Sequence, residues 1–120
     1  MNNFEKLNLR PLMPDIPTPD HLVAAEKICK YVVSQIISFE KTLPNDLQAG
    51  GTLANFGGIT FAIEKIGFKN PNIIILYGTL PDGSSVRLIQ HTSQLNLLLT
   101  AVPRKNPEQP RRPIGFGVTE

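Results

Sequence analysis

The sequence predicts an α+β domain: a long N-terminal helix packed on an antiparallel sheet of two hairpins plus a closing strand, with a short second helix. Three observations predict this fold. Apolar residues recur at helical spacing over residues 19–43, the period falls to two after residue 50, and glycine-containing turns divide the extended runs. A chain of 120 residues, 41% hydrophobic and 18% charged, is sized for one hydrophobic core.

Residues 1–18 are expected to form an extended N-terminal arm, and residues 19–120 a single domain. Three prolines in the arm exclude a continuous helix there. Five apolar side chains in the arm favour contact with a surface, such as that of a partner subunit, over a loose tail: Phe4, Leu7, Leu12, Met13 and Ile16.

The long helix is predicted from its end signals and from its apolar stripe. Thr18 can cap it, Pro19 suits the first turn, and Asp20 complements the positive end of the dipole. Pro44 ends it. The stripe that must be buried is Leu22, Ala25, Cys29, Val32, Ile36, Phe39 and Leu43. Further apolar residues widen this stripe, which suits either packing within the chain or a dimer interface: Ile28, Val33 and Ile37.

The first hairpin is predicted around Gly57-Gly58, a good two-residue type I′ turn. Such a turn pairs Phe56 with Ile59, and it places three cross-strand pairs on one face. These pairs are Phe56–Ile59, Ala54–Phe61 and Thr52–Ile63.

The second hairpin turns at Pro81-Asp82-Gly83, between the apolar run "NIIILYGTL" and the return strand "SSVRLIQH". The apolar run is typical of a central strand covered on both faces. On the return strand one face carries Val86, Leu88 and Gln90, and the other carries Arg87, Ile89 and His91.

Residues 92–103 return to helical spacing and predict the short second helix. Thr92 or Ser93 would cap it, and Pro103 would end it. Its buried side would be Leu95, Leu98, Leu99 and Val102. Beyond it, Pro107, Pro110 and Pro113 hold an extended run. This run leads into the strand "IGFGV", which could pair within its own chain or with a neighbour.

Composition narrows the classes of function. The net charge of +2 makes a nucleic-acid partner unlikely, and no run is long enough to span a bilayer. Cys29 is the only cysteine, so the chain has no disulfide framework. We expect its thiol to be reduced and buried. We find no apolar signal-peptide region, so a cytoplasmic protein is expected.

The common catalytic motifs are missing from the sequence, and neither a metal nor a cofactor is expected. His91 with Ser93 is the one pairing of a base with a nucleophile. A nucleotide-cleaving enzyme that uses His91 is therefore the minor alternative, because a histidine at a strand end is more often structural.

Two groups of residues are candidates for a ligand site. The first is amide-rich and lies at the predicted helix start, where free N–H groups favour an anion: Gln90, His91, Gln94 and Asn96. The second is the proline-flanked pair Arg111 and Arg112, with Phe116 nearby. Neighbours in an extended chain diverge, so Arg112 would fall on the side of Ile114 and Phe116 and could contact an anion or nucleotide. A structural ion pair, with Glu108 or Glu64, is the equal alternative.

The run "LIQHTSQLNLLLTAVPRKNPEQPRRPIGF" resembles a family of short bacterial and phage proteins with no assigned function. The layout also resembles the phage Thoeris anti-defence 1 family, oligomeric sponges that sequester cyclic ADP-ribose-type signals between subunits. That resemblance implies Asn96 at the adenine, Arg111 or Arg112 at the phosphates and Phe116 as the ring. That family also has an arginine on its helix, and Lys30 is the basic residue nearest to that position. A lysine lacks the bidentate hydrogen-bonding fork of an arginine.

Together these features predict a non-enzymatic phage sponge for a small phosphorylated nucleotide signal. The ligand would be a cyclic ADP-ribose-type molecule or a cyclic oligonucleotide. We expect a homo-oligomer formed through the long helix and the arm, in the host cytoplasm if phage-encoded. The alternative is a protein–protein interaction module of an uncharacterised bacterial or phage family, with no small-molecule ligand.

Overall fold

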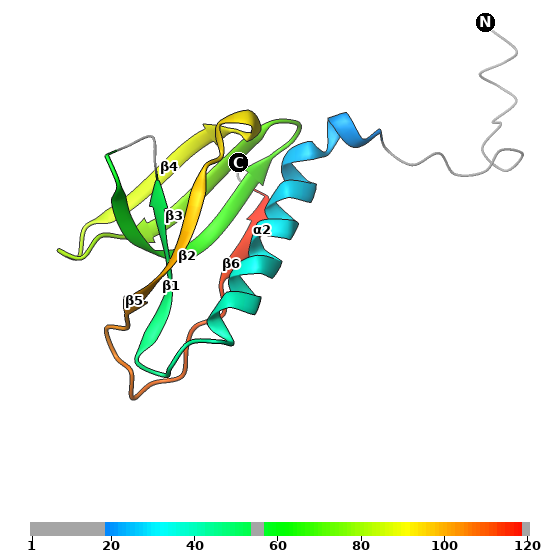
Figure 1. Ribbon diagram of the computed structural model, residues 1–120. Helices are drawn as coiled ribbons and strands as arrows, with labels where there is room; N and C mark the ends of the chain where they lie inside the picture. Colours follow the sequence, from blue (N-terminus) through cyan, green and yellow to red (C-terminus); the bar gives the residue numbers. More distant parts are fainter. Residues whose placement is uncertain (1–18, 54–56, 119–120) are drawn as a thin grey trace, which may run out of the picture.

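The structure is a computed structural model that describes residues 19–53 and 57–118. One helix lies across a six-stranded sheet, so the fold is α+β (Figure 1). The predicted arm, residues 1–18, lies outside the described residues. The elements are η2 (Asp20–Leu22), α2 (Ala24–Glu40), β1 (Leu47–Leu53), β2 (Ile59–Lys69), β3 (Ile73–Thr79), β4 (Ser85–His91), η4 (Thr92–Gln94), β5 (Leu97–Pro103) and β6 (Gly115–Val118).

The helix is shorter than predicted, with 17 residues in place of a run over 19–43. Val23 has φ −124° and separates α2 from the single turn η2, so the helix does not begin at Pro19. Its first N–H groups are capped from the loop between β2 and β3. Asn70 Oδ1 accepts from the Glu26 N–H at 3.1 Å, and the Pro71 carbonyl accepts from the Ala25 N–H at 2.8 Å. A cap supplied from another part of the fold leaves no local signal in the sequence.

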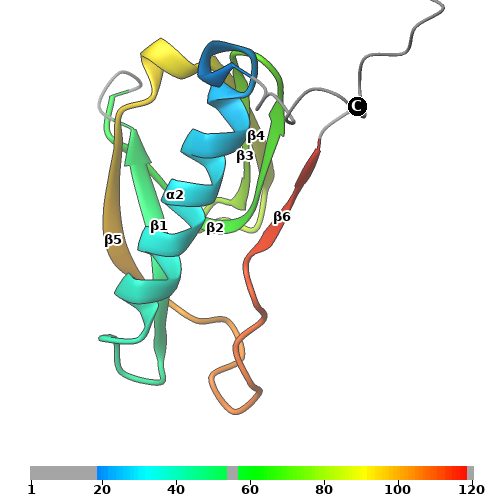
Figure 2. The same ribbon diagram turned by 90° about the vertical axis from the view of Figure 1, so that its right-hand side faces the viewer.

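The sheet is organised around β2. Its order is β4-β3-β2-β1-β5, with all of these neighbours antiparallel. On one edge β2 pairs with β3, and on the other it pairs first with β1 and then with β6. A register shift between Ile63 and Lys65 lies between these two stretches. The strand predicted at "IGFGV" therefore pairs within its own chain, parallel to β2. Figure 2 shows β5 and β6 on opposite sides of α2.

The first hairpin is confirmed, but its predicted register is wrong. Gly57 and Gly58 have positive φ, as expected of turn glycines. However, Leu53 pairs with Ile59 and Gly51 with Phe61, where the predicted register pairs Thr52 with Ile63. The predicted partners Ala54 and Phe56 lie outside the described residues. The observed register places the buried Ala49 and Leu53 on the same face as Phe61, where the predicted register would have put Thr52.

The second hairpin is confirmed in its turn and in the two faces of its return strand. Ile73 pairs with His91 and Thr79 with Ser85, and Gly83 turns the chain at φ 92°. Gln90 is buried with Val86 and Leu88 half-buried on its face, whereas the other face is exposed. The exposed residues are Arg87, Ile89 and His91.

The predicted second helix is wrong. Thr92–Gln94 forms a single turn, and Leu97–Pro103 is strand β5, which pairs with β1 through seven residues. Leu98, expected on the buried side of a helix, is 62% exposed. Leu97 and Leu99 are half-buried instead and pack against the core. A leucine-rich run fits the periodicity of a helix as well as that of a strand, and the pairing with β1 makes this segment a strand.

The core lies between α2 and the sheet. Ala25, Cys29 and Ile36 on the helix pack with buried sheet residues such as Ile66 and Leu76. The prediction of a buried thiol is confirmed: Cys29 is fully buried, and its Sγ donates to the Ile66 carbonyl at 3.7 Å. Burial raises the pKa of the Cys29 thiol to about 11.

Candidate ligand-binding site

The structure divides the predicted site residues between two ends of α2. Gln90, His91 and Gln94 lie beside the helix start, where the Thr92 N–H donates to the Asn72 carbonyl. Arg111 contacts the carbonyl of Glu40, the last residue of the helix. A helix of this length measures roughly 25 Å at 1.5 Å per residue. One chain therefore does not bring the two predicted groups together.

The polar residues around η4 mainly satisfy one another. His91 Nδ1 accepts from the Ser93 N–H at 3.1 Å, and Gln94 Oε1 accepts from the His91 N–H at 3.1 Å. These two bonds form a capping box around the turn. Gln90 Nε2 donates to the Gln94 carbonyl at 3.4 Å. Asn96 is exposed just before β5. His91 and Gln94 therefore cap this turn, a role that the sequence predicted for Thr92 or Ser93.

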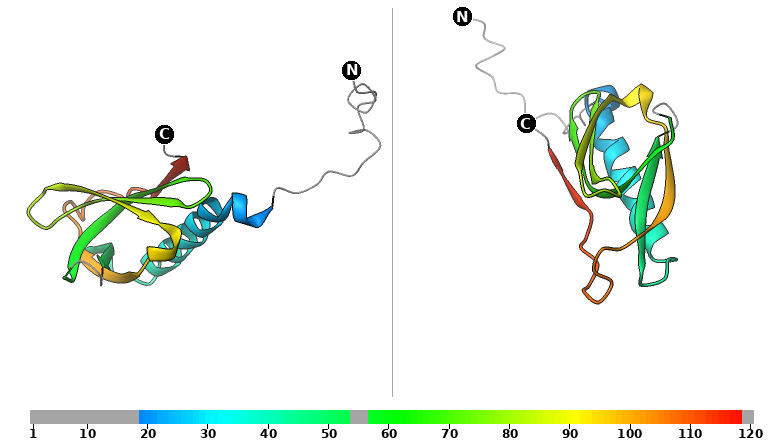
Figure 3. Two further views of the ribbon diagram at one scale, coloured as in Figure 1. Left: turned by 90° about the horizontal axis from the view of Figure 1, so that it is seen from above. Right: turned by 90° about the vertical axis from the view of Figure 1, so that its left-hand side faces the viewer.

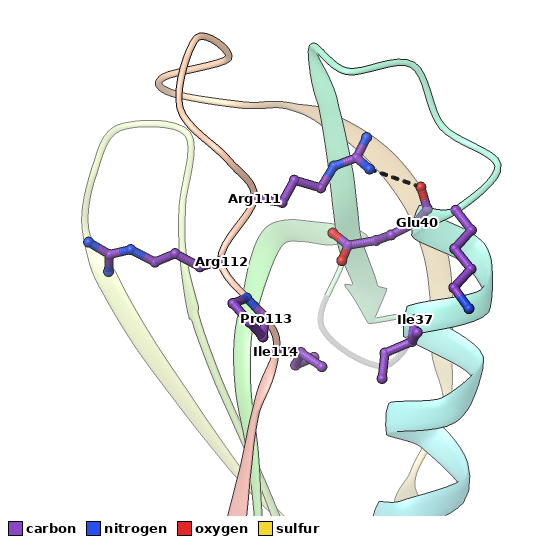
Figure 4. A pocket seen from close by; sticks show the side chains of 7 residues that line it. Ile37, Glu40, Arg111, Arg112, Pro113 and Ile114 are labelled. Atoms are coloured by element: carbon purple, nitrogen blue, oxygen red, sulfur yellow. Dashed lines mark hydrogen bonds between the residues drawn. The ribbon is translucent and has the colours of Figure 1, made fainter.

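Arg111 anchors the end of α2. Its guanidinium donates to the backbone carbonyls of Glu40, Leu43, Pro44 and Leu47, at distances between 2.6 and 3.3 Å. These include the orphan carbonyls of the helix end, where a cation also complements the dipole (Figure 4). The role of Arg111 is structural, and its partners are carbonyl groups rather than the Glu108 or Glu64 carboxylates considered from the sequence.

Arg112 diverges from Arg111, as predicted. Figure 4 shows Arg112 pointing away from the helix while Ile114 turns toward Ile37, so Arg112 does not share the side of Ile114. The groove between them, about 320 Å³, is lined by Ile37, Glu40, Lys41, Arg111, Arg112, Pro113 and Ile114. The Glu40 carboxylate faces this region and accepts from the Ala49 N–H at 2.9 Å. A carboxylate beside an occupied guanidinium makes a poor anion site.

Phe116 belongs to the packing of β6. Its ring centroid lies 5.6 Å from that of Phe68, and its side chain is 42% exposed. The proline-rich segment before it is not straight, because a turn at Asn106 reverses the chain. Arg104 holds that turn by donating to the carbonyls of Asn45 and Pro107.

A row of three side chains that was not predicted from the sequence crosses β2, β3 and β4. Lys65 pairs with Tyr77, and Tyr77 pairs with Arg87. Lys65 Nζ lies 5.0 Å from the Tyr77 ring centroid, and Arg87 Cζ lies 4.7 Å from it. Cation–π contacts therefore hold two positive charges on one tyrosine. The residues are far apart in sequence, and only the strand register places them together.

The next rows of this face are apolar and then basic again. Beside the first row lie Gly67, Ile75 and Ile89, and beyond them lie Lys69, Ile73 and His91. Ile89 is 63% exposed. The predicted site residue His91 thus shares this face. One carboxylate, Glu64, also lies near the first row, where it accepts from the Thr79 hydroxyl.

Neither Lys65 nor Arg87 has a carboxylate partner within the described residues. The helix lies on the other side of the curved sheet (Figure 3). Positive charges oriented by an aromatic ring beside the exposed side chain of Ile89 can neutralise an anion and contact a planar group. We refer to Lys65, Gly67, Lys69, Ile75, Tyr77, Arg87, Ile89 and His91 as the basic face.

These features define the chain as a small α+β protein with one helix, one sheet and a basic face opposite the helix. Residues 19–117 match a family of unknown function, DUF6173, and the protein belongs to this family. No curated protein and no solved structure matches the chain. Within the described ranges, no helix is long and apolar enough to cross a membrane.

Proposed function

We propose that the protein binds a small phosphorylated nucleotide on the basic face and holds it without chemical change. One observation carries the proposal: Lys65 and Arg87 are both oriented by Tyr77, and neither is neutralised by a carboxylate within residues 19–53 and 57–118. Cations that are already ordered lose little conformational entropy when an anion binds.

The spacing of the rows suits a nucleotide. Residues two apart on a strand lie roughly 6.7 Å apart, so the two basic rows are about 13 Å apart with an apolar row between them. A phosphate contacting Lys65 and Arg87 would leave a base free to lie against Ile89, the exposed side chain of a row in which Gly67 and Ile75 are buried. Lys69 and His91 would then face a second phosphate or a ribose.

Binding without turnover is the activity of the phage sponges that the sequence resembles. We extend the proposal to that role: sequestration of a nucleotide signal, such as a cyclic ADP-ribose-type molecule. The proposed contacts differ from those implied by the resemblance, because Arg111 is occupied at the helix end and the basic face takes its place.

The test is a thermal-shift screen of the protein against cyclic nucleotides, ADP-ribose and its cyclic isomers. A ligand at a hundred times its dissociation constant stabilises a fold by about 2.7 kcal/mol, which corresponds to several degrees at this size. We expect the shift to disappear in Arg87→Ala and Lys65→Ala. It should persist in Lys105→Ala, which removes an exposed charge from the loop after β5.

Other outcomes distinguish the alternatives. A bound nucleotide released intact by denaturation supports sequestration, whereas a cleaved one would favour the enzyme alternative with His91. Tighter binding of a single-stranded oligonucleotide, with a steep dependence on salt, would replace the small ligand by a nucleic acid. If no ligand raises the melting temperature, the proposal is wrong and a protein-interaction module is favoured.

A further inference from the structure

The exposed edge of β5 is unusually open to pairing. In the described part of the chain, β5 ends the strand order and pairs only with β1. Residues 97–102 read "LLLTAV" and contain no charge, and their pairing with β1 shows no register shift. Edge strands are normally protected by charges, bulges or prolines. The opposite edge, β4, has such protection in Arg87 and His91, whereas β5 has only its terminal Pro103.

Apolar surface continues from this edge onto the helix. A hollow of about 390 Å³ lies between α2 and β5, lined by Tyr31, Val32, Gln35, Leu95, Leu97 and Leu99. Tyr31 is 66% exposed beside it, and Leu98 is 62% exposed on the other face of the strand. The backbone N–H and C=O groups on the outer edge of β5 therefore lie between the exposed side chains of Tyr31 and Leu98. All the residues that form this strip are uncharged.

Thr100, at the midpoint of β5, provides a separate observation. Its hydroxyl oxygen is buried and has no hydrogen-bond partner among the described residues. A buried hydroxyl without a partner costs free energy, so rotation of the Thr100 side chain toward a partner outside the strand would be favourable.

We infer that β5 pairs antiparallel with β5 of a second copy, so that the two sheets become one continuous sheet. A two-fold axis at Thr100 would place the two Thr100 residues opposite each other, where threonine pairs form cross-strand hydrogen bonds. The axis would be perpendicular to the sheet, so both helices would lie on one face. The two hollows would then face each other, and Tyr31 of each copy would cover apolar surface. An uncharged strip meets its own copy without like-charge repulsion.

The experiment compares two substitutions at positions of equal exposure. The mass of the full chain in solution, measured by light scattering, should be that of two copies. Leu98→Lys places a charge on the β5 edge and should reduce the mass to one copy. Ile89→Lys, on β4, places the same charge at a residue that is 63% exposed and should leave the mass unchanged. A single-copy mass for the wild type, or a larger mass that Leu98→Lys leaves unchanged, would overturn the inference.

A cross-link gives a second readout that does not depend on Leu98→Lys remaining folded. Thr100→Cys should form a disulfide-linked dimer under mild oxidation, because cross-strand Cβ atoms lie about 4.5–5.5 Å apart. The native Cys29 is fully buried and should not contribute. Lys105→Cys, in the loop beyond β5, is the control. If Thr100→Cys cross-links no faster than Lys105→Cys, the proposed pairing is wrong.

Discussion

The guanidinium of Arg111 donates to the carbonyl of Glu40 with an Nη1–O distance of 3.1 Å, which ties the end of α2 to the segment that leads into β6. The same guanidinium reaches Pro44, in the turn between α2 and β1, and Leu47, the first residue of β1. One side chain thus joins three parts of the chain. The neighbouring Arg112 is exposed and points elsewhere (Figure 4).

Arg111→Ala is expected to lower the free energy of unfolding by about 1.5–3 kcal/mol, the range for hydrogen bonds to a charged group. Arg111→Lys should restore only part of this loss, because an ammonium group lacks the planar fork that reaches several carbonyls. Arg112→Ala, the control, should change stability by at most about 0.5 kcal/mol. Urea unfolding measures all three. Equal losses at positions 111 and 112 would contradict the anchoring role.

Gly78→Ala is expected to destabilise the sheet where β2 and β3 meet. A Cβ atom at Gly78 would lie 2.3 Å from the Ala62 carbonyl oxygen and 2.3 Å from a ring carbon of Phe61. Overpacking of this kind typically costs about 1–3 kcal/mol. Gly117→Ala is the matched control, because a Cβ there meets no atom within 4 Å. If the two variants have the same urea midpoint, the close packing at Gly78 does not limit stability.

Stability is expected to fall at alkaline pH because of Cys29. Its thiol has a folded pKa of about 11, raised by burial from an ordinary value of 9.0. The unfolded chain therefore releases this proton first, so the contribution is intact below pH 9 and is lost as pH rises toward 11. Urea midpoints measured at pH 7 and pH 10.5 should differ more for the wild type than for Cys29→Ala. An identical decline in both proteins would assign the effect to other groups.

The sequence predicted elements best where local chemistry and tertiary contacts agree. The hairpin at Gly83 was predicted correctly in its turn and in the faces of β4, because the turn residues and the alternation on β4 specify the same arrangement. Residues 92–103 were predicted wrongly because leucines at positions 95, 98 and 99 fit a helix as well as a strand. Seven backbone pairs with β1, a partner more than 40 residues earlier, decide in favour of the strand.

The candidate site was harder to predict than the fold. Arg111 and Arg112 are equivalent in the sequence, and only the position of the helix end gives one of them a structural role. Lys65, Tyr77 and Arg87 belong to three different strands, so their proximity depends on two registers at once. The bulge before Lys65 also shifts which residues of β2 lie on the basic face, and no turn residue in the sequence marks it.

Tyr77→Leu tests whether the tyrosine orders the two cations for binding. The substitution keeps Lys65 and Arg87 but removes the ring that both contact. Ordering a flexible side chain on binding costs about 0.5–1.5 kcal/mol, so the loss of this ordering for both cations should weaken nucleotide binding roughly 5- to 150-fold. Titration calorimetry with the ligand found in the screen measures the change. Tyr77→Phe keeps the ring and should bind like the wild type. If Tyr77→Leu also retains full affinity while remaining folded, the ligand does not depend on cations ordered by Tyr77, and the site must lie elsewhere.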